Sequence, residues 1–353
     1  MTRETVPVHI LTGFLGSGKT TVLNRALVSE FGPETAVIVN EFGQVALDQH
    51  FIATRSEETL VLKSGCVCCT VRADLVTTLM ELAARSDGAQ QQLSRVIIET
   101  SGVSDPVPIL QTLRSDFNLR ARFHIGTVIC TADATMPAAD RTRSEALMQI
   151  GAADRCVITK HDLAGVSGAG DAETWVQSVN PIAVISNAAD TDISRLFSEQ
   201  HVPVLELDAR LSHLQSSIVK EPGHEIRSGV LRISDSHSWS AFAVWLSALI
   251  HWHGDHLLRM KGMLWDDERA TWIAVHSVRR FIHPPEHLAN VSETSPAGAC
   301  LVFIGENLDI ALIERSYRRW VLLQGGGHIG ATPKGCITSQ ISRQTYKQSG
   351  VSL

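Results

Sequence analysis

Short apolar runs alternate with amphipathic stretches along the first part of the chain. This alternation is typical of a mostly parallel sheet flanked by helices, so we expect an α/β domain over residues 1–207. The predicted strands are Val6–Leu11, Thr35–Val39, Thr59–Leu62, Arg95–Glu99, Gly126–Cys130, Cys156–Thr159 and Ala183–Ile185. The stretches with helical periodicity are Thr20–Ser29, Arg72–Ala84, Pro106–Leu113, Ser144–Ile150 and Ala172–Val179.

A second, smaller unit follows a charged stretch without periodicity. Residues 208–228 include Glu221-Pro222-Gly223-His224 and favour a linker. The next elements indicate an α+β domain over residues 229–322, and the Gly-, Ser- and Gln-rich residues 323–353 predict a loosely ordered tail. The predicted strands of this domain are Gly229–Ile233, Leu257–Trp265, Thr271–Val275 and Cys300–Ile304, and its predicted helices are Trp239–Ile250 and Ile310–Tyr317.

Composition narrows the class of protein. The chain has 353 residues, 44% of them hydrophobic and 19% charged, as in ordinary globular proteins. A formal net charge of -6 provides no basic field for nucleic acid or an anionic membrane, so we expect neither partner. The longest apolar stretch, Ala241–Ile250, is too short to span a bilayer. The amino terminus lacks the apolar segment of a signal peptide, and we therefore expect a cytoplasmic protein.

A glycine-rich segment follows the first predicted strand directly. Gly13-Phe14-Leu15-Gly16-Ser17-Gly18-Lys19-Thr20 is a complete Walker A motif between a strand and a helix. In such a P-loop, backbone N–H groups and the helix N-terminus surround phosphates, and the lysine reaches the β- and γ-phosphates. We expect residues 13–20 and the adjoining Thr21 to bind nucleotide. Lys19 and Glu99 are the predicted catalytic residues.

A magnesium site is expected at the same edge of the sheet. Mg²⁺ neutralises the charge that develops during phosphoryl transfer, and the protein holds it with a hydroxyl and a carboxylate. The Thr20 hydroxyl is the first predicted ligand. The second is Glu99, which ends the apolar strand Val96-Ile97-Ile98 and precedes Thr100-Ser101-Gly102.

Two further strand ends predict recognition of the base. Thr159-Lys160-His161-Asp162 is a variant of the Asn/Thr-Lys-x-Asp motif, in which the aspartate accepts N1–H and N2–H₂ of guanine. Adenine lacks this pair of donors, so it would leave the carboxylate without a partner. Ser186-Asn187-Ala188, after the next strand, occupies the place of the loop behind the base. The order of motifs favours GTP over ATP.

A cysteine cluster precedes the predicted helix Arg72–Ala84. Cys66, Cys68 and Cys69 are three of the seven cysteines, and Gly65 precedes them. Their sulfurs can converge only through a turn, because alternate residues of a strand point to opposite faces. Three thiolates suit Zn²⁺ or another thiophilic ion and leave the fourth coordination position open. Buried free thiols and a redox pair are the alternatives.

The motifs together resemble one family. The combination of Gly13–Thr20, Asn40-Glu41-Phe42-Gly43, Gly65–Cys69, Glu99–Gly102 and Thr159–Asp162 is similar to the CobW-like GTPases, which are related to the nickel-insertion GTPases of urease and hydrogenase maturation. Residues Leu257–Gly262 and Val278–Arg280 resemble the family's C-terminal domain, so the resemblance covers about residues 6–320.

The resemblance implies a GTP-hydrolysing metallochaperone. Such a protein would bind a transition metal, zinc before cobalt, at the three cysteines and deliver it to a client metalloprotein. A homodimer is compatible with this function. The resemblance also places Asn40–Gly43 in a switch segment, through which GTP and Mg²⁺ would order the cysteine loop.

Histidines after the long apolar helix suggest an accessory metal site. His251, His253 and His256 lie in the run His251-Trp252-His253-Gly254-Asp255-His256, and such tracts can bind metal. The alternative is that they shape the end of the helix. Two other functions also stay open: a regulatory or redox-sensing GTPase, and a P-loop kinase of small molecules whose cysteines are structural.

Overall fold

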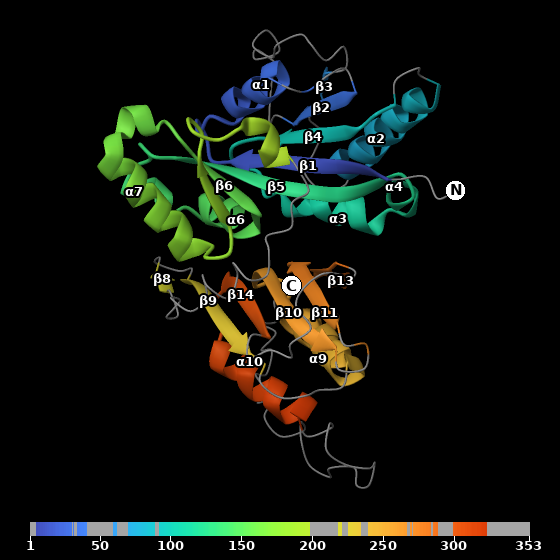
Figure 1. Ribbon diagram of the computed structural model, residues 1–353, viewed down its shortest axis with the longest axis vertical. Helices are drawn as coiled ribbons and strands as arrows, with labels where there is room; N and C mark the ends of the chain where they lie inside the picture. The colour runs from blue at the N-terminus through green and yellow to red at the C-terminus, as the bar shows by residue number, and fades with distance from the viewer. Residues whose placement is uncertain are drawn as a thin grey trace, which may run out of the picture.

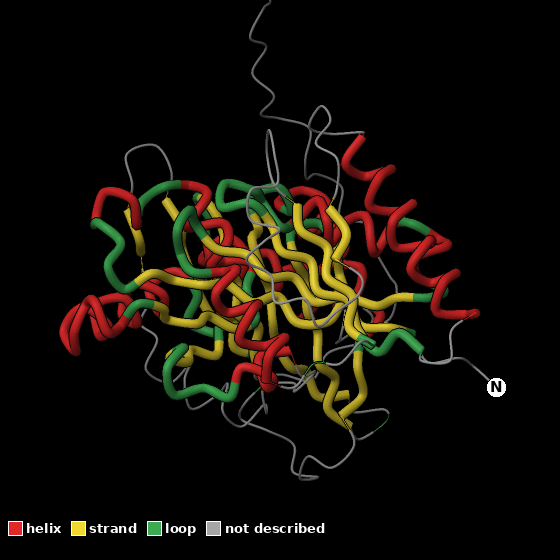
Figure 2. Tube along the Cα trace, turned by 90° about the horizontal axis from the view of Figure 1, so that it is seen from above, coloured by secondary structure: helices red, strands yellow, loops and turns green. Residues whose placement is uncertain are grey.

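The computed structural model describes residues 5–29, 31, 34–40, 59–61, 70–88, 92–197, 218–220, 225–233, 239–266, 269, 271–283, 285–288 and 299–322. Within these residues, two sheets with flanking helices form the molecule (Figure 1). Viewed from above, the strands run through the middle and most helices lie around them (Figure 2).

The first sheet is parallel throughout the described residues. Its strand order is β3-β2-β4-β1-β5-β6-β7. All the strands predicted for the first part are confirmed, because each is an apolar run bounded by turn residues. Their bounds are β1 Val6–Gly13, β2 Thr35–Asn40, β3 Thr59–Val61, β4 Arg95–Thr100, β5 Phe123–Asp133, β6 Arg155–Thr159 and β7 Val184–Asn187.

Helices cover both faces of this sheet. Successive strand side chains alternate between the two faces, so Ile97 packs beneath α1 and the 3₁₀ helix η2 while Ile98 packs beneath α2 and α3. Burial on both faces explains why the strands are continuous apolar runs. The helices are α1 Lys19–Ser29, α2 Thr70–Gly88, α3 Val107–Ser115, α4 Phe117–Arg120, α5 Ala138–Arg141, α6 Ser144–Ala152, α7 His161–Val179 and η2 Ile193–Phe197.

Some helical segments carry no clear sequence pattern. The predicted helix Ala172–Val179 is only the second half of α7, because Gly165, Gly168 and Gly170 lower the helix propensity of the first half. At Gly165 the backbone leaves the helical conformation, with φ 68° and ψ 179°. The one-turn helix α4 forms because the Asp116 carboxylate caps it, accepting from the amides of Asn118 and Leu119 at 3.0 and 3.1 Å.

The second sheet is antiparallel. Its order is β12-β11-β10-β14-β9-β8, and β13 pairs with β11. The helices α9 and α10 pack on one face of the sheet. The elements are β8 Ile218–Lys220, β9 Glu225–Arg232, α9 Trp239–His253, β10 Leu257–Asp266, β11 Thr271–Val278, β12 Phe281–Ile282, β13 Glu286–Leu288, β14 Cys300–Glu306, α10 Ile310–Tyr317 and η3 Arg318–Leu322.

The predicted linker needs a correction. Residues 218–220 and 225–228, interpreted as part of a linker over 208–228, are strand residues that pair as β8 and β9. A strand of three residues is too short to show a period-2 pattern, so β8 could not be predicted from the sequence. The rest of that stretch and the predicted tail 323–353 lie outside the described residues.

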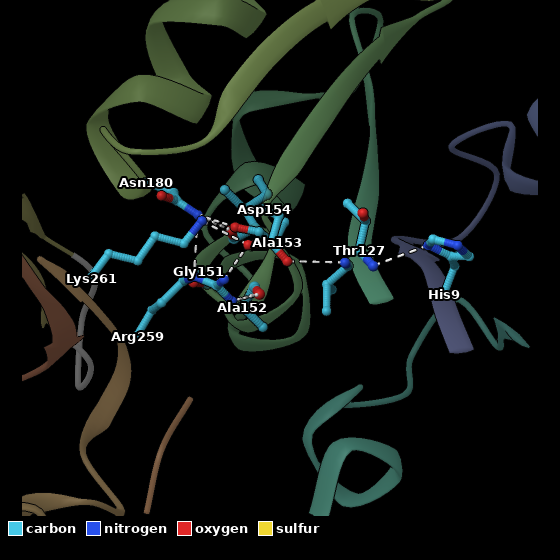
Figure 3. Close-up of polar contacts among 11 residues, drawn as sticks. His9, Thr127, Gly151, Ala152, Ala153, Asp154, Asn180, Arg259 and Lys261 are labelled. Carbon is cyan, nitrogen blue, oxygen red and sulfur yellow. Dashed lines mark hydrogen bonds and ion pairs between the residues drawn. The ribbon is translucent and has the colours of Figure 1, made fainter. Parts of the chain in front are cut away.

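The other face of the second sheet packs against the first unit. Along β14, Leu301 and Phe303 contact the core beneath α9 and α10, whereas Val302 and Ile304 join a core with α6 and α7. Charged side chains cross the same interface: Arg259 and Lys261 of β10 reach Asp154, which precedes β6 (Figure 3). The two sheets therefore share an apolar cluster, and charged side chains also join them at this interface.

Candidate functional site

The carboxyl ends of β1, β4, β5, β6 and β7 meet at one edge of the parallel sheet. Ligands of open α/β sheets bind outside the carboxyl ends of the strands. Most of the predicted site residues of the described chain lie on the loops and helix starts at this edge.

The loop after β1 has the backbone of a phosphate cradle. Three glycines have positive φ angles, Gly13 at 144°, Gly16 at 70° and Gly18 at 84°. A side chain at Gly13 would also meet the Thr131 hydroxyl at 2.3 Å and the Ser17 hydroxyl at 2.7 Å, so only glycine fits. The Ser17 amide donates to the Phe14 carbonyl at 3.1 Å, which closes the turn before α1.

Lys19, Thr20 and Glu99 converge at the start of α1. The Lys19 ammonium lies within the loop and donates to the Gly13 carbonyl at 2.9 Å and to that of Phe14 at 3.3 Å. The Thr20 hydroxyl donates to Glu99 Oε1 at 2.7 Å. Both Lys19 and Glu99 are buried. The two predicted magnesium ligands thus lie side by side, although they are 79 residues apart in the sequence. Thr21 is exposed on the next position of the helix.

The end of β6 has a strained backbone. Lys160 adopts a left-handed conformation with φ 56°, which costs energy for a residue with a side chain. Its ammonium group pairs with Asp133 at 2.6 Å, at the end of β5. Burial alone would raise the pKa of Asp133, but the bonds from Lys160 and Thr135 outweigh it and hold that pKa below its usual value. Lys160 is thereby fixed between β6 and α7.

Two other residues of the base motif differ in their surroundings: Thr159 contacts the P-loop, and Asp162 faces the solvent. The Thr159 hydroxyl donates to the Ser17 carbonyl at 2.8 Å, which joins the predicted base site to the phosphate loop. Asp162 lies exposed in the first turn of α7, where its carboxylate is open to a ligand.

The end of β7 lies beside this motif. In the sheet, Ser186 and Asn187 are the register partners of Val157 and Ile158. The Ala188 amide donates to the Ile158 carbonyl at 2.8 Å, and the Ala188 carbonyl accepts from Arg25 of α1 at 2.5 Å. The structure therefore brings Ser186, Asn187 and Ala188 to the same edge as Thr159 and the P-loop.

Sequence reasoning missed Gln149, a polar residue that shapes the site. This fully buried side chain of α6 donates to the carbonyls of Gly102 at 3.2 Å and Ser104 at 3.0 Å. It therefore holds the loop that follows Glu99. No motif marks it, because a glutamine within an amphipathic helix has no distinctive signature. Asp133 was missed because β5 extends past the predicted end at Cys130; the rule that located Glu99 at a strand end would have found it.

The residues predicted to bind a transition metal are not among the described residues at this edge of the sheet. Cys66, Cys68 and Cys69, and most of the switch segment Asn40–Gly43, lie outside the described residues. His251 and His253 end α9 and His256 follows it. Within the described part of the chain, no group of three His, Cys, Asp or Glu residues is arranged to hold a metal ion, so these three histidines do not form the predicted accessory site. No helix there is long and apolar enough to cross a membrane.

Two families match the chain, one on each unit. The CobW/HypB/UreG nucleotide-binding domain matches residues 7–187. The cobalamin synthesis protein cobW C-terminal domain matches residues 226–320. The matches thus include the P-loop, the Thr159–Asp162 motif and nearly the whole second sheet.

Relatives resemble the chain over both units. The zinc chaperone YjiA of Escherichia coli is 32% identical over 279 residues, which is 78% of this chain and 86% of that protein. A crystal structure of Zn(II)-bound YjiA GTPase covers 90% of this chain and 99% of its own, with a TM-score of 0.64 and 26% identity. A zinc-regulated GTPase metalloprotein activator of Dictyostelium discoideum is 35% identical over 150 residues, 37% of this chain and 30% of that protein.

Proposed function

Because this chain belongs to the CobW family of GTPases, we propose that it is a zinc chaperone that couples GTP hydrolysis to delivery of zinc to a client metalloprotein. The observation that carries the proposal is the meeting of Lys19, Thr20 and Glu99 at the carboxyl edge of the sheet, in a chain similar to a zinc chaperone along most of its length.

The P-loop residues would bind and orient the triphosphate. The positive φ angles of Gly13, Gly16 and Gly18 give this loop the backbone of a phosphate cradle, and the dipole of α1 favours negative charge there. When GTP enters, the Lys19 ammonium would exchange its carbonyl partners for phosphate oxygens. This exchange favours the charged phosphate over a neutral carbonyl.

The residues at this edge fit magnesium. A hydroxyl and a carboxylate oxygen that already touch, Thr20 Oγ1 and Glu99 Oε1, are the hard oxygen ligands that Mg²⁺ prefers. When bound, the ion would neutralise charge between the β- and γ-phosphates. Glu99 and Thr20 would hold it, and Gln149 would hold the loop behind Glu99 in place.

Guanine recognition is assigned to the loops after β6 and β7. Asp162 would accept the N1–H and N2–H₂ groups of guanine, and the Lys160 stem would cover one face of the base. The segment Ser186–Ala188 would close the other side, held by the Arg25 bond to the Ala188 carbonyl.

The cargo site is assigned to the cysteine cluster. Cys66, Cys68 and Cys69 offer three thiolates to zinc, and the open fourth position allows a client thiol or imidazole to take the ion. The similar E. coli protein is a zinc chaperone, which favours zinc over cobalt here. Free thiolates need a reducing compartment, so we place this activity in the cytoplasm.

Zinc titration in two nucleotide states tests the proposal. Zinc affinity of the full chain is measured with a non-hydrolysable GTP analogue and with GDP, for the wild type and for a variant with Cys66→Ser, Cys68→Ser and Cys69→Ser. We expect GTP to tighten zinc binding about 5- to 150-fold in the wild type, and we expect the triple variant to lose the tight site. Affinity should also fall at lower pH, because protons compete for the thiolates.

A matched control and three outcomes distinguish the proposal from its alternatives. The control replaces His251, His253 and His256 by Gln and should leave zinc affinity unchanged. Equal zinc affinity with GTP and GDP would contradict nucleotide control and favour a redox-sensing GTPase. Unchanged affinity in the cysteine variant would remove the cargo site. Transfer of phosphate from GTP to a small molecule would favour the kinase alternative.

A further inference from the structure

One arginine of the second unit reaches the loop that follows Glu99. Arg279 lies in the two-residue turn between β11 and β12, where Val278 and Phe281 pair with each other. Its guanidinium donates to the Asp105 carboxylate at 3.3 Å, and Asp105 belongs to the connection between β4 and α3. The two residues are 174 positions apart in the sequence, so the contact exists only because the two units pack together.

The backbone of Arg279 is strained. Its φ angle is 47°, a left-handed conformation for which glycine is the usual residue in a two-residue hairpin turn. A residue with a side chain costs energy in this conformation, and such residues cluster at functional sites. Glycine would remove the strain, so an arginine at this position points to a role for its guanidinium.

Contacts within the second unit hold the turn in place. The Arg279 amide donates to the Leu258 carbonyl at 3.3 Å, and its guanidinium donates to the Asp255 carbonyl at 2.9 Å. The adjacent Arg280 donates to the Asp255 carboxylate at 2.6 Å and to the His251 carbonyl at 2.8 Å. These bonds tie the turn to the end of α9, to the connection after it and to β10.

The loop that Arg279 reaches also lies against the P-loop. A side chain at Gly102 would place its Cβ 2.7 Å from the Cα of Leu15, so the two backbones are in close contact. Asp105 Oδ2 accepts from Arg279, whereas its Oδ1 accepts from the Val107 amide at 2.9 Å. This short loop thus contacts the P-loop through Gly102 and the second unit through Asp105.

The pair between Arg279 and Asp105 is mostly shielded from water. Its side chains are 19% and 27% exposed, and the same guanidinium nitrogen lies 3.2 Å from the Met148 sulfur of α6. The next residue of α6, Gln149, donates to two carbonyls of the same loop. Solvent and salt therefore screen this pair less than a pair at the surface.

We propose that Arg279 is a positioning residue for GTP hydrolysis, through which the second unit holds the loop behind Glu99. Arg279 acts through Asp105, and the inference rests on the proposed role of Glu99 as a magnesium ligand, because the loop begins directly after the strand that carries Glu99. Any change in the second unit that moves the turn away from Asp105 would then slow GTP turnover.

Steady-state GTP hydrolysis by the full chain tests the role of the guanidinium. Arg279→Gly removes the side chain and suits the left-handed backbone, so it adds no strain to the turn. We expect kcat to fall about three- to tenfold with a smaller change in KM, a loss within the range of coupling between groups in contact. Arg279→Lys keeps a positive charge and should lose less. Wild-type kcat in the glycine variant, or a rise in KM alone, overturns the proposal.

A double-mutant cycle assigns the effect to Asp105. Asp105→Asn keeps an oxygen for the Val107 amide but presents a donor to Arg279 in place of a carboxylate oxygen. The double variant Arg279→Gly, Asp105→Asn should be no slower than the slower of the two single variants, since each change removes the same pair. Additive losses overturn the route through Asp105.

The matched control is Arg114→Met. Arg114 also joins the two units, by donating to the Ile282 carbonyl at 2.8 Å, but it lies in the last turn of α3. Its loss weakens the interface without touching the loop, so kcat should stay close to the wild-type value. An equal fall of kcat in Arg114→Met and Arg279→Gly overturns the specific role of Arg279.

Glu99→Gln separates this inference from the proposed function. A wild-type kcat in Glu99→Gln overturns the proposed magnesium site and the inference that rests on it. A loss of turnover in Glu99→Gln together with wild-type kcat in Arg279→Gly overturns the role of Arg279 alone.

Discussion

Single residues at the end of β6 support the proposed base site. Lys160 is held in a left-handed backbone conformation by its pair with Asp133, and Thr159 is tied to the P-loop by the Ser17 carbonyl. This strain is compensated by neighbouring bonds and fixes the start of α7, where Asp162 lies. The carboxylate of Asp162 is exposed, so a base can reach it.

Asp162→Asn should reverse the base preference. The amide of asparagine presents a donor where guanine also presents a donor, so GTP affinity should fall by about 1.5–3 kcal/mol, or roughly 10- to 150-fold. Xanthine carries a carbonyl at that position and should gain an acceptor–donor pair. Binding of fluorescent GTP and XTP analogues to the wild type and to the Asp162→Asn variant measures the change in base preference.

The control for this substitution is the nearby exposed Asp171→Asn on α7, which should not alter GTP affinity. Equal affinity of the wild type for ATP and GTP would show that Asp162 does not select guanine.

At the scale of elements, the connection between β4 and α3 links the site to the rest of the molecule. It begins after Glu99 and Thr100, and its Gly102 and Ser104 carbonyls are held by Gln149 of α6. Near its end, Asp105 accepts from the α3 amide of Val107 at 2.9 Å. This loop therefore joins the predicted magnesium ligand to two helices.

Gln149→Met should slow GTP turnover more than it weakens GTP binding. Methionine keeps the volume but removes both donors, so the loop behind Glu99 loses bonds that together contribute about 1–3 kcal/mol. We expect kcat to fall roughly three- to tenfold with a smaller change in KM, because the proposed role of Glu99 is to hold the ion that neutralises the charge developing during phosphoryl transfer.

Steady-state GTP hydrolysis measures this effect, and Gln177→Met on the exposed face of α7 is the matched control. A rise in KM at constant kcat would mean that Gln149 supports binding of the substrate instead. Gln149→Glu should be no better than methionine, because a carboxylate cannot donate to the two carbonyls.

The strands and the phosphate site could be predicted from the sequence, because both depend on local patterns. Apolar runs mark the buried parallel strands, and residues that follow such strands must meet at one edge, which is why Thr20 and Glu99 come together. Contacts set by packing could not be predicted. Gln149 and Arg25 have no sequence signature that distinguishes them from other helical residues. Their hydrogen-bond partners depend on how the helices pack on the sheet.

The contact between the two units also could not be predicted from the sequence. Asp154 and Arg259 are 105 residues apart, and no periodicity marks either of them. Their pairing depends on how the second sheet packs against α6, where Gly151 allows Leu258 to approach. Likewise, short elements such as β8 depend on a neighbouring strand and lack a pattern of their own.

On the scale of the whole molecule, polar contacts join the two units at the shared interface. Arg279 donates to Asp105 at 3.3 Å and to the Asp255 carbonyl at 2.9 Å, so it connects the loop after β4 with the second unit. Arg114 of α3 donates to the Ile282 carbonyl at 2.8 Å. These contacts surround the interface that contains His276 and His283.

The stability of this interface should depend on pH through the two buried histidines. His276 faces Lys261, Arg259, His283 and Asp154, and His283 also faces Arg114. Burial and these cations lower the two pKa values to about 3 and about 4, below the value of about 6.5 in an unfolded chain. Between pH 6.5 and 4 the unfolded chain therefore binds more protons, and the free energy of unfolding must fall as the pH falls.

Urea unfolding at pH 7 and pH 5 measures this dependence. Each histidine should account for about 1–2 kcal/mol of the loss over that interval, because one pKa unit corresponds to about 1.36 kcal/mol. The double variant His276→Gln, His283→Gln should lose less stability between the two pH values than the wild type. His251→Gln, whose ring is exposed on α9, should behave like the wild type. Asp154 should not contribute in this interval, because its pKa lies below its usual value and the carboxylate stays charged. An equal pH dependence in the wild type and the double variant would mean that the interface histidines are already charged in the folded protein.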